Sequence, residues 1–141
     1  MGRSIIMTLI QEFYLIKWDW WVKVFYVVDS IPIDYILQEL IELGLDDEES
    51  FISLFENEEN KGYTYSNLSR RKSIIVIGET TCPGEFQHTF DHEKFHLAIH
   101  IAKEDGIDPY GEDLAYLVGD IGMQMFPIAK KFLCEHCREE L

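Results

Sequence analysis

The chain has 141 residues, with 26 Asp or Glu against 12 Lys or Arg, and its formal net charge is −14. That much negative charge repels phosphate backbones, so we predict no nucleic-acid binding. With 47% hydrophobic and 13% aromatic residues the chain can bury a core. This excludes a disordered composition and predicts a single domain over residues 1–141.

Cysteine content and hydropathy predict the compartment. The chain has three cysteines, an odd number that does not indicate a disulfide framework, and this favours a reducing environment. No apolar run reaches the length of a membrane span, and the first residues lack the pattern of a signal peptide. We therefore expect a cytoplasmic protein that makes no contact with membranes.

One β-hairpin, two helices and two further strands are predicted before the last helices of the chain. Residues 5–16 and 21–28 are rich in β-branched and aromatic residues and are separated by a plausible reversal, which predicts a β-hairpin. An apolar period typical of a helix then runs from Pro32 to Gly44, and Asp46 or Asp47 caps a second short helix. Strands are expected at residues 63–65 and 73–77, with residues 70–72 as a solvated basic turn.

Helices are predicted in the second half. Thr80 or Thr81 is expected to cap a helix over residues 83–104. Asp108 and the proline after it predict the start of another helix. Pro127 is expected to interrupt or kink the chain before a last helical stretch. The sequence therefore predicts an α+β domain, in which a small, mostly antiparallel sheet packs against helices.

A His-Glu-x-x-His pattern in the helix over residues 83–104 points to metal chemistry. His92 and His96 are four residues apart, so both ring nitrogens lie on one helix face and can bind one Zn²⁺ ion. Glu93 can reach a water on that metal without binding the metal itself, as a zinc hydrolase needs. The His and Glu content of the chain predicts only about 0.02 accidental matches.

A catalytic zinc usually has three protein ligands and one water. Glu112 is the preferred third ligand, because a helix packed antiparallel to the first would bring its first turn near the metal. His100 stays open as an alternative, although steps of four residues drift about 40° around a helix. Tyr116, one turn after Glu112, is expected to donate to an oxyanion or to orient Glu112.

A cysteine-containing segment near the C-terminus and an acidic stretch in the middle of the chain are weaker indications of function. The segment Cys134-Glu135-His136-Cys137 resembles half of a metal knuckle, and only Cys82 remains to complete it. Residues 46–60 carry seven carboxylates and no base, which is typical of a solvated face. The sharper alternative is that this face mimics the charge of DNA and captures a basic protein.

From His92 to Gly122 the chain resembles zincin-like proteins of the gluzincin type, which pair a His-Glu-x-x-His helix with a glutamate on a following helix. More narrowly, it resembles small uncharacterised proteins encoded by bacteriophages and by their hosts' mobile elements. That resemblance also draws on residues 18–20, 64–67, 73–78 and 112–117. It implies a metal held by His92, His96 and Glu112, with Glu93 as the base, in the host cytoplasm if the protein is phage-encoded.

The expected function is a zinc-dependent hydrolase, specifically a small metallopeptidase with a peptide or protein substrate. Glu93 would take a proton from water and pass it to the leaving amine. Residues 73–77 are expected to offer a sheet edge to an extended peptide. The alternative is a non-catalytic, zinc-stabilised module whose acidic surface captures a host or viral protein. A third hypothesis is that the histidines are structural and bind no metal.

Overall fold

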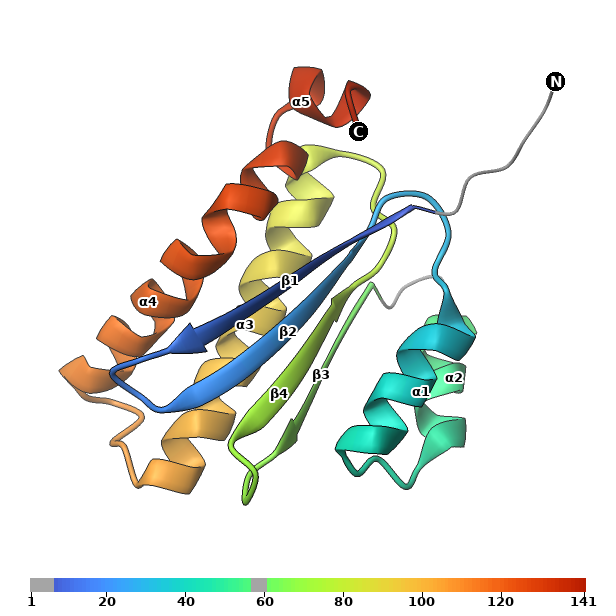
Figure 1. Cartoon of the computed structure of the whole chain (residues 1–141). Helices are drawn as coiled ribbons and strands as arrows, with labels where there is room; N and C mark the ends of the chain where they lie inside the picture. The colour runs from blue at the N-terminus through green and yellow to red at the C-terminus, as the bar shows by residue number, and fades with distance from the viewer. Residues whose placement is uncertain (1–6, 57–60) are drawn as a thin grey trace, which may run out of the picture.

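The computed structural model describes residues 7–56 and 61–141. A four-stranded mixed sheet lies between two helical layers (Figure 1). The strands are β1 (Thr8–Leu15), β2 (Trp20–Val27), β3 (Gly62–Asn67) and β4 (Lys72–Ile77). The helices are α1 (Ile33–Leu43), α2 (Glu48–Glu56), α3 (Pro83–Asp105), α4 (Glu112–Ala129) and α5 (Glu135–Glu139), with the 3-10 turn η1 (Lys130–Phe132) between the last two. No helix within the described ranges is both long and apolar enough to span a membrane.

The strand order is β1-β2-β4-β3. The predicted hairpin of β1 and β2 is confirmed, and β3 and β4 form a second antiparallel pair. β2 and β4 pair in parallel, which requires a crossover between the hairpins, and α1 and α2 supply it. The prediction of an α+β domain is confirmed, with a mixed sheet. The expectation that residues 73–77 offer an edge is wrong, because β4 is an interior strand and β3 lies at the edge.

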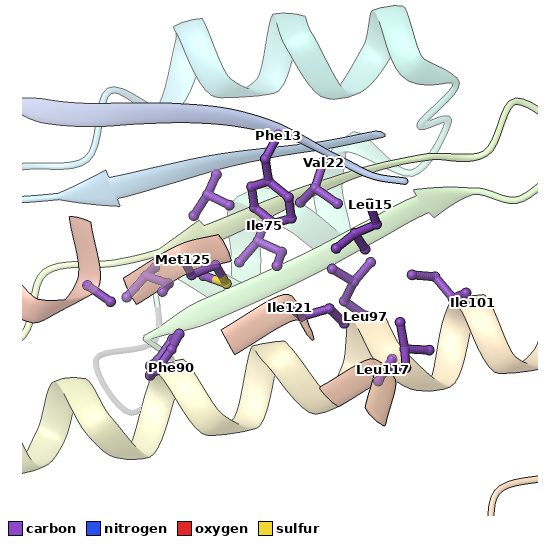
Figure 2. Close-up of a cluster of buried hydrophobic side chains, with 14 of the residues drawn as sticks. Phe13, Leu15, Val22, Ile75, Phe90, Leu97, Ile101, Leu117, Ile121 and Met125 are labelled. Atoms are coloured by element: carbon purple, nitrogen blue, oxygen red, sulfur yellow. The ribbon is translucent and has the colours of Figure 1, made fainter. Parts of the chain in front are cut away.

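Both faces of the central strands are buried. Val24 and Ile75 point into a large core beneath α3 and α4, and Figure 2 shows Ile75 there among side chains from both helices. Phe25 and Val76 point into a second core beneath α1 and α2. Strands covered on both faces are typically apolar throughout, which explains the uninterrupted apolar runs in β2 and β4.

Most helix boundaries match the sequence, and the caps explain why. Gly44 ends α1 in the left-handed region, with φ of 119°. Asp47 caps α2, since its Oδ1 accepts the Ser50 N–H at 3.2 Å. The cap predicted for α3 is wrong by one or two residues, because Cys82 occupies the N-cap position.

Two boundaries in the last third of the chain differ from the prediction. Asp108 does not start a helix: its Oδ1 accepts the Tyr110 N–H, and its carbonyl accepts the Gly111 N–H, which closes a separate turn. α4 therefore begins at Glu112. Pro127 does not interrupt the chain, since α4 continues past it to Ala129. The proline lies in the last turn of α4, so the hydrogen bond lost with its missing N–H affects only the end of the helix.

The sequence predicts that residues 70–72 form a solvated basic turn, but Arg71 makes tertiary contacts instead. Its guanidinium donates two hydrogen bonds to the Asp105 carboxylate, at 2.8 and 2.9 Å. It also donates to the carbonyls of Trp18 and Asp19 and lies over the Trp20 ring. One side chain thus ties the end of α3 to the turns of both hairpins.

Replacing Arg71 with Ala should lower the free energy of unfolding by about 1–3 kcal/mol, because several charge-assisted hydrogen bonds are lost together. Urea denaturation followed by circular dichroism measures this. The neighbouring Arg70 donates to the Glu42 carbonyl and is otherwise exposed. Arg70→Ala is therefore the matched control and should change stability by less than about 0.5 kcal/mol. Equal losses in both variants would contradict the assignment.

Candidate metal centre

The predicted helix carrying His92, Glu93 and His96 is present as α3. It buries apolar side chains at helical spacing against the sheet: Phe86, Phe90, Leu97 and Ile101. That face sets the rotation of the helix. Glu93 falls at the margin of the buried face beside β3, while His92 and His96 fall outside it and remain exposed.

The two histidine rings converge. His92 Nε2 and His96 Nε2 are 3.1 Å apart, and the His92 side chain is 58% exposed. In the free protein one ring N–H donates to the other ring nitrogen. Two nitrogens bound tetrahedrally to zinc, each at about 2.0–2.1 Å, are themselves about 3.3 Å apart. The pair therefore fits two positions of a zinc ion, and binding would displace the shared proton.

Glu93 lies next to His92 and is a buried residue, with 4% of its surface exposed. Its Oε1 accepts a hydrogen bond from Thr64 Oγ1 at 2.7 Å, and its Oε2 lies 3.9 Å from His92 Nε2. Burial raises the pKa of this carboxyl, while the Thr64 hydroxyl and the charges of His92 and His96 oppose the shift. A raised pKa suits a group that must take up and release a proton near neutrality.

The structure does not bring Glu112 to the histidine pair. α4 packs beside α3 on the flank of Lys94, whose Nζ lies 3.4 Å from where a Cβ on Gly122 would stand. Lys94 is two residues from His92 and from His96, which places it about 200° around the helix from each. Among residues 7–56 and 61–141, no three His, Cys, Asp or Glu side chains are grouped to hold a metal.

Tyr116 and the two outer histidines of α3, His88 and His100, lie apart as well. Tyr116 is exposed, with the Lys17 ammonium 5.2 Å from its ring centre, beside the first hairpin rather than beside the histidines. The rings of His88 and His100 are each centred 6.3 Å from the nearest ring of the His92–His96 pair.

His100 belongs to a partly buried hydrogen-bond chain. Trp20 Nε1 donates to Ser73 Oγ at 2.8 Å, and Ser66 Oγ lies 2.6 Å from both Ser73 Oγ and His100 Nδ1. Ser73 Oγ accepts the hydrogen bond from Trp20, so the Ser73 hydroxyl can donate its own hydrogen to Ser66 Oγ. The Ser66 hydroxyl can then donate to Nδ1 of a neutral His100. Burial lowers the pKa of His100, consistent with that neutral state.

Sequence reasoning missed the contribution of β3. Gly62, Thr64 and Ser66 are alternate residues, so all three lie on the face of β3 that packs against α3. Thr64 and Ser66 bond Glu93 and His100, and Gly62 leaves room for the Glu93 carboxylate. The period-two pattern of small and hydroxyl residues was the available signal.

Gly62→Ala should destabilise the fold by about 1–3 kcal/mol through overpacking. A Cβ there would lie 2.7 Å from both Cγ and Oε2 of Glu93. Thermal denaturation measures the change. Gly119→Ala is the control, because its Cβ would meet nothing within 4 Å in the interior of α4. It should be neutral or stabilising by up to about 1 kcal/mol. Destabilisation by Gly119→Ala alone would contradict this packing.

Glu93→Gln should stabilise the metal-free protein at alkaline pH. The pKa of Glu93 is raised in the folded state by burial, so its contribution to stability is greatest below the unfolded pKa and is lost as pH rises through the folded pKa. Gln does not ionise and avoids that loss. Urea denaturation in the presence of chelator should show a higher free energy of unfolding for Glu93→Gln than for wild type at pH 8. This difference should disappear at pH 3.5. A gain that is independent of pH would contradict the assignment.

Comparison with protein-family models, curated proteins and solved structures found no match. The resemblance to gluzincin-type proteins therefore stays a prediction from His92, Glu93 and His96 and the weaker motifs around them. Function is inferred from the side chains themselves.

Proposed function

We propose that this protein is a zinc-dependent hydrolase that cleaves peptides. The observation that carries the proposal is the convergence of His92 Nε2 and His96 Nε2, 3.1 Å apart on the exposed side of α3. The spacing matches two tetrahedral positions around one zinc. Glu93 supplies a carboxylate 3.9 Å from one of those nitrogens. A further protein ligand, for which the sequence favours Glu112, would have to approach by movement of the chain.

Each residue of the site has a separate proposed role. A zinc ion held by His92 and His96 would act as a Lewis acid towards a water and a carbonyl oxygen. Glu93 Oε2 lies on the histidine side, so it can accept the proton of an attacking water and deliver it to the leaving amine nitrogen. Thr64 holds Oε1, which fixes the carboxylate so that Oε2 faces the histidines.

A peptide substrate is favoured by the position of β3. This strand is at the edge of the sheet, and Thr64 links it directly to Glu93. Edge strands offer unpaired N–H and C=O groups to an extended peptide. A peptide added along β3 would run beside α3 near Glu93, a role that the interior strand β4 cannot take.

A second candidate is a non-catalytic module stabilised by zinc. The burial of Glu93 favours it, since a residue that is only 4% exposed is poorly accessible to a substrate. The exposed carboxylates of Asp46, Asp47, Glu48 and Glu49 at the start of α2 then offer a surface for a basic protein. Glu93→Gln separates the candidates, because it keeps both histidines.

Zinc content tests the site. Protein stripped by chelator, reloaded with zinc and desalted should hold about one zinc per chain by elemental mass spectrometry. His92→Ala and His96→Ala should hold almost none, whereas His88→Ala, the matched control on the same helix face, should keep it. Wild-type protein without zinc would overturn the proposal.

Hydrolysis tests the catalytic role of Glu93. A quenched-fluorescence peptide library should detect cleavage by zinc-loaded wild type, and Glu93→Gln should retain zinc but lose about 10²–10⁴-fold in kcat. Equal cleavage by both proteins would overturn the role of Glu93. Zinc binding without cleavage of any peptide would favour the non-catalytic module.

A further inference from the structure

A cleft of about 290 Å³ lies between α1 and strands β2 and β4. Trp21, Lys72 and Ile74 line it from the strands. Leu43 lines it from α1, and Arg70 from the turn between β3 and β4. The cleft is separate from the histidines, because α1 and α3 lie on opposite faces of the sheet (Figure 1).

Hydrogen bonds from one asparagine hold the two sides of the cleft together. Asn67 Nδ2 donates to the Leu43 carbonyl at 2.8 Å, and Asn67 Oδ1 accepts the Arg70 backbone N–H at 3.2 Å. The Arg70 guanidinium donates from Nη1 to the Glu42 carbonyl at 3.1 Å. The β3–β4 turn is thus tied to the end of α1, so the cleft is formed before any ligand binds, which reduces the cost of binding.

The carboxylates that line the cleft already have partners. Lys23 Nζ donates to Glu39 Oε1 and lies 3.9 Å from Glu12 Oε1. Glu42 Oε1 accepts a hydrogen bond at 3.3 Å from Gln38, one turn earlier on the same helix. One end of the cleft is therefore occupied by an ion-pair group that leaves little net charge.

The two cations at the other end of the cleft are Arg70 and Lys72. Neither forms an ion pair with any carboxylate of residues 7–56 and 61–141. Lys72 is exposed, and the Arg70 guanidinium keeps most of its N–H groups after its one bond to α1. A guanidinium and an ammonium side by side provide the donors that a carboxylate or phosphate requires.

An exposed indole lies next to these cations. Trp21 is 51% exposed, and Lys72 is its partner in the parallel register of β2 and β4. The ring is supported from behind by Tyr14, with ring centres 4.7 Å apart. A supported aromatic surface of this kind favours stacking with another planar ring.

We propose that this cleft binds a small planar anion, whose ring lies against Trp21 and whose carboxylate or phosphate is held by Arg70 and Lys72. The volume is near the lower limit for ligand sites and limits the ring system to about two fused rings. The net charge of −14 repels anions at long range, so binding depends on these two local cations and should weaken as salt screens them.

The test is an NMR titration of the isotope-labelled full chain with naphthoate. The indole N–H signal of Trp21, assigned with Trp21→Phe, should shift with a Kd of about 1 mM or tighter. The signals of Trp18 and Trp20 should stay, since those indoles donate to protein acceptors elsewhere. Naphthamide, which lacks the charge, and acetate, which lacks the ring, should each bind at least about tenfold more weakly. Naphthyl phosphate is titrated in parallel, and the tighter of the two anions identifies the preferred group.

Variants test the assignment of the two cations. The double variant Arg70→Gln/Lys72→Gln should bind naphthoate at least about tenfold more weakly than wild type. Lys103→Gln, which removes an exposed lysine in the last turn of α3, is the matched control and should leave binding unchanged. The amide spectrum of each variant shows whether it is folded.

Three results would overturn the proposal. The first is a Trp21 signal that does not move with either naphthoate or naphthyl phosphate. The second is equal affinity for naphthoate and naphthamide, because an apolar surface alone would then account for binding. The third is a folded double variant that binds naphthoate as tightly as wild type does.

Discussion

The burial of both faces of the central strands is the constraint on which the rest of the fold depends. Val24, Phe25, Ile75 and Val76 are all fully buried, yet successive residues point to opposite faces of the sheet. Helices on one face alone would leave half of these side chains in water. The parallel pairing of β2 with β4 meets this requirement, because its crossover, α1 and α2, covers the second face while α3 and α4 cover the first.

The same core determines how α3 is rotated, and that rotation decides the chemistry of its surface. Leu97 and Ile101 must face the sheet, so Glu93 falls at the margin of the core and His92 outside it. A carboxylate in this position is costly, since burial opposes its charge. β3 limits the cost with a hydrogen bond from Thr64 and with the space left by Gly62. Buried groups with raised pKa values concentrate at functional sites, which is why Glu93 rather than an exposed acid carries the proposed mechanism.

The net charge of −14 acts on the proposed metal chemistry. A negative field raises the local concentration of divalent cations, which favours metal capture by the exposed pair of His92 and His96.

Local patterns in the sequence were sufficient to predict the first hairpin, strand β4, helix α1 and the helix with His92, Glu93 and His96, because periodicity and capping depend on neighbouring residues. They failed at Asp108, where a side-chain turn replaced the helix start, and at Arg71, whose partners lie far away in sequence. Only the tertiary structure decided that β3 is the edge strand and that Thr64 and Gly62 enclose Glu93. It also decided that α4 carries Glu112 and Tyr116 to the other flank of α3. The spacing of residues along one helix follows from its geometry, whereas contacts between elements depend on how buried surfaces pack, which no local pattern specifies.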